Sequence, residues 1–236
     1  MTAVKNQYTL SLIDRSEDTN VNEWVYQVLR RSLMCGEIRP GIALTIRGLA
    51  EKLDVSPMPV RQALHKLSSQ AAVEVKDNRR VVVPLISPPK FKELYELRIL
   101  LETHAADKAL PYVGDVKYAE LCRLDGLVDA AYADGNVVRG SLANQAFHRY
   151  LYGLNPTQVC LPMIESLWLQ LGPFVRIALS KLDSYYDNDR HQQALEAIQN
   201  KDAAALRLAI EADIRDGISM IRDVDQIYKD LVKTES

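Results

Sequence analysis

Apolar residues recur at helical spacing in three segments of the first third of the chain, and they crowd into short valine-rich runs just after them. The first segment, 21–37, places six apolar side chains on one face: Val21, Trp24, Val25, Val28, Leu29 and Leu33. Two shorter amphipathic segments follow, at 46–53 and from residue 57 on. The runs AAVEV and RVVVPL, separated by KDNR, are typical of a β-hairpin. The pattern therefore predicts three helices and a hairpin over residues 21–84.

A proline-rich stretch, PLISPPK at 84–90, separates this part from the rest of the chain and has the composition of a short, stiff linker. Beyond it the helical period continues through six segments divided by turn signals: 88–110, 115–134, 140–153, 156–180, 184–200 and 202–231. Such lengths predict an all-α, six-helix antiparallel bundle. The expected organisation is a flexible N-terminal arm at 1–20, a domain of three helices and a hairpin at 21–84, a linker at 85–90 and a helical domain at 91–233.

Composition and charge narrow the class of protein. The net charge is −2, but residues 21–84 hold ten Lys/Arg against six Asp/Glu, a local excess of +4 that suits a partner made of phosphate. The chain has no apolar run long enough to span a membrane, and its first twenty residues lack the order of a signal peptide, so we expect a cytoplasmic protein. Three widely spaced cysteines indicate neither a disulfide framework nor a thiolate metal site.

The segment TIRGLAEKLDVSPMPVRQALHKL has the pattern of a helix-turn-helix. Thr45 can cap its first helix, and Asp54 stands in the turn, where a short polar side chain tolerates a left-handed backbone. If Ser56 caps the second helix, Pro57 and Pro59 fall in its first turn. Because the N–H groups of a first turn have no internal acceptor, neither proline removes a hydrogen bond there.

The outer side of this second helix carries polar side chains that can meet DNA. They are Arg61, Gln62 and His65, with Lys66 near the expected path of the phosphates. The entrance of a recognition helix is the part that reaches base edges in the major groove. Any amphipathic helix has a polar face, but here the helix pair, the turn, the basic balance and the hairpin agree, so the pattern indicates DNA binding.

Residues 21–84 resemble the winged helix-turn-helix of the GntR superfamily of bacterial transcription regulators, through IRPGIALT, RGLAEKLDVS and PVRQALHKL. The helical part is similar to the FCD ligand-binding domain of the FadR subfamily, through LYELRILLET, NQAFHRYLYGLN, SLWLQLGP and HQQALEAIQNKDAAAL. The resemblance implies a homodimer. Its first domain would bind a palindromic operator in double-stranded DNA, and its second domain would bind a small effector.

Carried across to this chain, the resemblance matches Arg47 and Arg61 to family arginines that contact DNA, and together with the polar face of the second helix and the basic wing they complete the expected set of DNA-contacting residues. The set is Arg47, Ser56, Met58, Arg61, Gln62, His65, Lys66, Arg79 and Arg80. Two positions depart from the family: Pro57 stands where arginine is usual, and Arg80 stands where the wing tip usually has glycine. Pro57 removes a side chain that could bind guanine, and Arg80 adds positive charge near DNA. We therefore expect an operator that differs from the family's common half-site.

The resemblance also implies a metal site in the helical domain. Many family members bind a divalent metal with an aspartate and a histidine four residues apart, plus two histidines on the last two helices. Here His148 and His191 match two of the histidines. Asn144 takes the place of the aspartate, and Asp213 takes the place of the last histidine. Imidazole and carboxylate suit zinc, nickel or manganese, whereas a neutral amide is a poor ligand. Two interpretations stay open: one divalent metal on this set, or polar groups that bind the effector directly.

Arg98 is the second candidate in the helical domain. It lies in a stripe with Tyr95 and Glu102, beside the apolar side of its helix. An arginine at that border can point into the bundle and clamp a carboxylate, and family members often use the matching arginine for an organic acid. The alternative is a simple ion pair with Glu102, four residues away. The effector-binding set expected from the sequence is Tyr95, Arg98, Glu102, Asn144, His148, His191 and Asp213.

These features favour a transcription regulator, of the repressor type, that responds to a small organic acid and is not an enzyme. One alternative is a metal-dependent hydrolase-like domain tethered to DNA, but the sequence offers no obvious general base beside the ligand set. Another is an effector-free DNA-binding protein. That alternative predicts an apolar bundle interior, which the polar residues at 98, 144, 148, 191 and 213 contradict.

Overall fold

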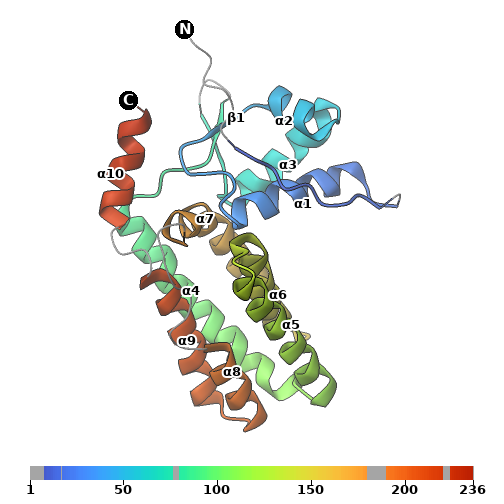
Figure 1. Ribbon diagram of the computed structural model, residues 1–236, viewed down its shortest axis with the longest axis vertical. Helices are drawn as coiled ribbons and strands as arrows, with labels where there is room; N and C mark the ends of the chain where they lie inside the picture. Colours follow the sequence, from blue (N-terminus) through green and yellow to red (C-terminus); the bar gives the residue numbers. More distant parts are fainter. Residues whose placement is uncertain (1–7, 17, 77–79, 180–189, 220–223, 236) are drawn as a thin grey trace. The chain divides into compact units, whose positions relative to one another are not determined.

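The structure is a computed structural model that describes residues 8–16, 18–76, 80–179, 190–219 and 224–235 (Figure 1). The chain forms two compact units. One comprises the described residues up to Phe91 together with Trp168–Ile177 and the last helix, and the other comprises Lys92–Leu167 and the described part of Ala178–Arg222. No described helix combines the length and the apolar character needed to cross a membrane.

The first unit contains a winged helix-turn-helix, as predicted. Its elements are α1 (Val21–Met34), β1 (Ala43–Leu44), α2 (Ile46–Leu53), α3 (Pro57–Ser69), β2 (Glu74–Val75), β3 (Val81–Val82) and, from the C-terminal end, α10 (Val224–Glu235). The strands form an antiparallel sheet in the order β1-β3-β2. Strand β1 precedes α2 in the chain and was not predicted, because two residues are too few to show an alternating pattern.

The turn between α2 and α3 confirms most of the predicted local chemistry. The Thr45 hydroxyl accepts from the Gly48 N–H at 3.1 Å, and Asp54 has a left-handed backbone with φ of 50°. Pro57 is the first residue of α3. Ser56 occupies the capping position but its side chain makes no capping hydrogen bond. Pro59, at the third helical position, has no N–H to donate to it, so the Ser56 hydroxyl stays available to another partner.

The described part of the N-terminal arm contacts this unit at a few points, and its predicted flexibility stays a prediction. Tyr8 is buried. The Lys52 ammonium donates to the Tyr8 carbonyl at 2.7 Å and lies 4.1 Å from the centre of its ring. The Trp24 indole N–H donates to the Ile13 carbonyl at 2.9 Å. Composition suggested mobility because the arm is polar, but its aromatic and backbone groups find partners only in the tertiary structure.

Helix α7 (Leu161–Leu179) approaches α1 closely at Gly172. A Cβ atom at this glycine would lie 2.7 Å from the Leu33 carbonyl oxygen and 2.7 Å from the Met34 Cα. Because both are backbone atoms, neither can turn aside as a side chain would. The absence of a side chain at Gly172 is therefore required for the two helices to pack at this distance.

We expect Gly172→Ala to lower the free energy of unfolding by about 1–3 kcal/mol, the usual cost of overpacking. Gly126, in helix α5 (Asp115–Ala133), is the matched control, because it is exposed and a Cβ there meets no atom within 4 Å. Gly126→Ala should raise stability by up to about 1 kcal/mol through helix propensity. Thermal unfolding followed by circular dichroism measures both, and equal midpoints for the two variants would contradict the close approach.

The second unit is all-α. It contains most of α4 (Pro88–Ala109), the short 3-10 helix η1 (Leu110–Tyr112), α5 (Asp115–Ala133), α6 (Val137–Gly153), the start of α7, α8 (Arg190–Gln199) and α9 (Ala203–Ser219). Helix α5 packs on α6 and on α8, and α8 packs on α9 (Figure 1). The predicted last helix, 202–231, is described as two helices, α9 and α10, on either side of residues 220–223, which lie outside the described residues. The apolar pattern runs on through this stretch without proline, so the sequence carried no stop signal there.

Candidate functional site

The predicted DNA-contacting residues of α2 and α3 lie on the exposed side of the winged helix-turn-helix. Arg47 is exposed on α2, while Arg61, Gln62 and His65 are exposed on α3 opposite its buried face. Met58 is 58% exposed although its side chain is apolar, and Ser56 is exposed beside it. Arginine and glutamine next to an uncovered apolar group form the combination that reads base edges and thymine methyl groups.

Lys66 makes two contacts with α1. Its ammonium lies 3.3 Å from a carboxylate oxygen of Glu23 and 3.6 Å from the centre of the Tyr26 ring, both on α1. The helical period put Lys66 on the polar side of α3, but the packing of α1 against α3 supplies a countercharge and an aromatic face there. The side chain therefore turns toward α1 in the structure, and its contact with DNA phosphates stays a prediction.

The wing is described only at its base. Lys76 N–H donates to the Arg80 carbonyl at 2.8 Å, which closes the hairpin, and the Arg80 side chain is exposed. Arg79 lies outside the described residues. Arg80 therefore stands directly before β3.

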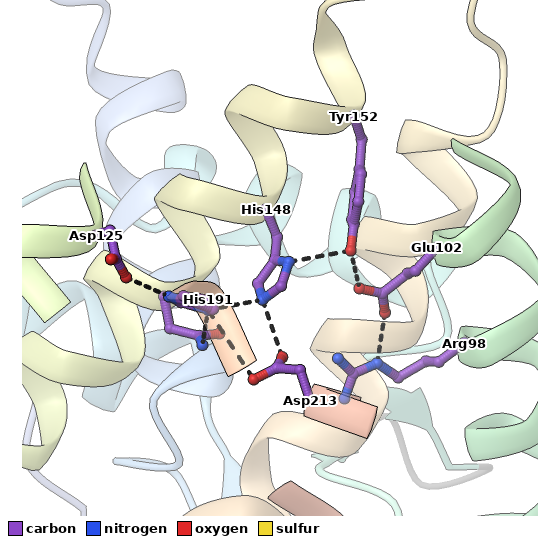
Figure 2. Close-up of polar contacts among 8 residues, drawn as sticks. Arg98, Glu102, Asp125, His148, Tyr152, His191 and Asp213 are labelled. Atoms are coloured by element: carbon purple, nitrogen blue, oxygen red, sulfur yellow. Dashed lines mark hydrogen bonds and ion pairs between the residues drawn. The ribbon is translucent and has the colours of Figure 1, made fainter. Parts of the chain in front are cut away.

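In the second unit, three predicted ligand residues converge from three helices (Figure 2). His148 lies on α6, His191 in the first turn of α8 and Asp213 on α9. The Nε2 atoms of the two histidines are 3.2 Å apart, and His148 Nε2 is 3.1 Å from Asp213 Oδ2. His191 Nε2 is 4.0 Å from Asp213 Oδ1. The histidines are 2% and 3% exposed, so the cluster is nearly closed to water.

Asp125 orients the His191 ring through Nδ1, the ring nitrogen that does not face the cluster. Its Oδ1 lies 2.8 Å from His191 Nδ1. Because a carboxylate only accepts hydrogen bonds, Nδ1 carries the proton and Nε2 presents its lone pair to the cluster. The His191 ring also stacks on Phe147, with centroids 4.3 Å apart, so its plane is held by packing as well. Histidines that bind metals commonly donate their other ring N–H to a carboxylate, which holds the ring in place.

Asn144 meets the cluster through its amide nitrogen. Nδ2 lies 3.1 Å from His191 Nε2 and donates to the lone pair of that atom. The residue is thus a hydrogen-bond partner of the cluster in this orientation, and rotation of the amide would bring its oxygen to the same place. The sequence correctly placed Asn144 beside the histidines, because four residues on a helix put it on the face of His148.

The charges of the cluster favour an ionised Asp213. Burial by itself would raise the pKa of this carboxyl group. The hydrogen bond with His148, and the positive charges that His148, His191 and Arg98 can supply, outweigh burial, and the pKa of Asp213 is lowered. The site therefore combines a carboxylate with imidazole nitrogens in a dry setting.

Arg98 and Glu102 form the ion pair that was the simpler interpretation, with Arg98 Nε 2.7 Å from Glu102 Oε1. This pair is not a surface pair, since the Arg98 side chain is 17% exposed and Glu102 is fully buried. Glu102 also accepts from the Tyr152 hydroxyl at 3.0 Å. Tyr95 faces another way, and its hydroxyl accepts from Arg215 at 3.4 Å.

Two residues of the site were not predicted, Asp125 and Tyr152. Tyr152 stands four residues after His148 and shares its face of α6, so helical spacing could have found it. Asp125 interrupts the buried stripe of Leu121, Leu124 and Val128 on α5, and a carboxylate at such a position is a signal in itself. The sequence could not show that Asp125 meets His191.

Comparison with known proteins assigns a family to the N-terminal region and to the helical region of the chain. Residues 22–83 match the family described as bacterial regulatory proteins, gntR family, and residues 93–216 match the FCD domain. The HTH-type transcriptional regulator McbR of Escherichia coli is 26% identical over 196 residues, which cover 82% of this chain and 89% of McbR. The gluconate operon transcriptional repressor of Bacillus subtilis is 26% identical over 212 residues, 83% of each chain. The solved structure of E. coli McbR/YncC superposes with a TM-score of 0.81 at 25% identity, covering 89% of this chain and 99% of that one.

The fold and the two matched regions define a transcription regulator that joins a DNA-binding head to an effector domain. The chain belongs to the GntR family of bacterial regulatory proteins and carries its FCD domain.

Proposed function

We propose that this regulator is a dimeric repressor, released from a palindromic operator by an organic acid that binds beside a divalent metal in the FCD domain. The observation that carries the proposal is the convergence of His148 Nε2, His191 Nε2 and an Asp213 oxygen within 4.8 Å of one another. A repressor of this kind acts on chromosomal DNA, which agrees with the basic, exposed face of α2 and α3. Its similarity to the gluconate operon repressor supports the direction of control.

The donor set fits a metal. A lone pair of His191 points at His148 Nε2, only 3.2 Å away, and the Asp213 carboxylate adds a negative charge. Acceptors this close need a proton or a cation between them, and a metal in place of a proton on His148 Nε2 would satisfy all three groups. Two imidazoles and one carboxylate leave coordination positions open and suit zinc, nickel or manganese. The metal would be held by His148, His191 and Asp213, and when bound it would supply a Lewis acid for an anionic ligand.

Arg98 supplies the second contact for an acid. The ion pair with Glu102 uses Nε, and the two terminal nitrogens of Arg98 make no hydrogen bond with a described residue. Figure 2 shows the guanidinium group next to Asp213, whose charge also acts on it. A carboxylate that lies between Arg98 and the metal would therefore meet two positive groups in a nearly dry setting.

The test selects operators from random duplexes with the full-length protein and then measures operator release. Hydroxy acids and dicarboxylic acids are titrated with added zinc, with the corresponding neutral amides as matched controls. We expect a palindromic site, release by at least one acid but by no amide, and a weaker response after chelation. If no palindrome is enriched, or if acids and amides act alike, the proposal fails.

A further inference from the structure

Four side chains form an unbroken hydrogen-bonded line from the partly open side of the site to the metal-facing histidine (Figure 2). Arg98 Nε donates to Glu102 at 2.7 Å, and the Tyr152 hydroxyl donates to the other oxygen of Glu102 at 3.0 Å. The same hydroxyl lies 3.1 Å from Nδ1 of His148. Tyr152 and Glu102 are both fully buried, so water does not compete for these bonds.

Proton counting along this line indicates that Nδ1 of His148 carries a proton. A phenol has one proton, and Arg98 holds Glu102 as a carboxylate that can only accept. The Tyr152 proton therefore goes to Glu102, and the hydroxyl oxygen must accept from His148 Nδ1–H.

We propose that Tyr152 is a positioning residue, which keeps a proton on Nδ1 of His148 and so leaves Nε2, the atom that faces Asp213 and His191, to bind the metal. The inference rests on the proposed metal site. Arg98 serves two purposes in this arrangement, because it offers its terminal nitrogens to the acid and keeps Glu102 in the accepting state. The acid and the metal would then each raise the affinity of the protein for the other, since both depend on the Arg98–Glu102 ion pair.

Direct observation of the histidine proton tests the inference without any metal. The chain has only four histidines, so a long-range proton–nitrogen spectrum of metal-free, histidine-labelled protein resolves each ring, and His148→Gln assigns the signal. We expect Nδ1 of His148 to carry a proton in the wild type. In Tyr152→Phe, which keeps the ring but removes the acceptor, Nδ1 should lose its proton, so that the ring is protonated only on Nε2, beside Asp213.

Tyr150→Phe on the same helix is the matched control and should leave the spectrum unchanged. A wild-type His148 with a bare Nδ1, or a Tyr152→Phe spectrum identical to that of the wild type, would overturn the relay. Glu102→Gln is a second variant that keeps the packing, and because an amide can donate to the tyrosine oxygen, it should also loosen the preference for Nδ1.

Calorimetric titration of the full-length protein with zinc gives the second readout. Tyr152→Phe should weaken zinc binding about 10–100-fold, the usual effect of removing an outer partner of a metal ligand, whereas Tyr150→Phe should change it less than about twofold. If the wild type binds no zinc, the proposed metal site fails, while the nitrogen spectrum still decides the relay. If zinc binds equally to wild type and Tyr152→Phe, the metal site stands and the positioning role fails.

Discussion

Replacing His148 or His191 with alanine is expected to abolish the proposed binding of a divalent metal to the FCD domain. Each imidazole supplies one of three converging donors, and the remaining histidine and carboxylate cannot complete a closed set. The loss of affinity should exceed the roughly 100-fold that changes to outer partners produce. The measurement is the metal content of protein purified without added metal, together with calorimetric titration with zinc, nickel and manganese.

His104→Ala is the matched control, because His104 is an exposed histidine on α4. This variant should retain the wild-type metal content. Asp213→Ala should resemble the two histidine variants, since it removes the only carboxylate of the cluster identified among the described residues. Metal that remains at one ion per chain in all three cluster variants would show that it binds elsewhere.

Replacing Arg61 with alanine is expected to weaken operator binding by about 1–3 kcal/mol per half-site and to relax the base preference at one position. Arg61 is exposed near the entrance of α3, the part of a recognition helix that meets bases. Arg47→Ala should weaken binding to all sequences alike and lower the salt slope by about one, as the loss of a phosphate contact does. Fluorescence anisotropy on the selected operator and on scrambled DNA, over a range of salt, separates these effects.

Lys66→Ala provides the internal control on the same helix. Its charge already pairs with Glu23 and lies over Tyr26, so its removal should change neither the affinity nor the salt slope appreciably. A loss for Lys66→Ala as large as that for Arg47→Ala would contradict the orientation of this side chain. The comparison is sharp because the two variants remove the same charge from the same domain.

Local chemistry was predictable wherever near neighbours in the chain decide it. The Thr45 cap, the left-handed Asp54 and the proline at the start of α3 depend on residues within one turn. The face shared by Asn144 and His148 is likewise a matter of helical spacing. The unused capping position of Ser56 could also have been anticipated, because Pro59 has no N–H at the place where the cap would bind.

Contacts between distant segments were not predictable in this way. Asp125 and His191 are 66 residues apart, and the packing of α5 against α8 brings them together. Tyr8 and Lys52 are 44 residues apart, and their contact joins the polar arm to the winged helix-turn-helix. Lys66 is a further example. The sequence predicts that it contacts DNA, and in the fold its ammonium pairs with Glu23 on α1.

The sequence by itself determined the class of this protein: a winged helix-turn-helix followed by an FCD helical domain, with candidate ligands on separate helices. Periodicity and capping report which face of a helix is buried, and that is sufficient to define elements and their order. Only the tertiary structure decided which polar groups meet in the interior. A buried carboxylate or hydroxyl needs a partner from another helix, and the identity of that partner depends on how the helices pack.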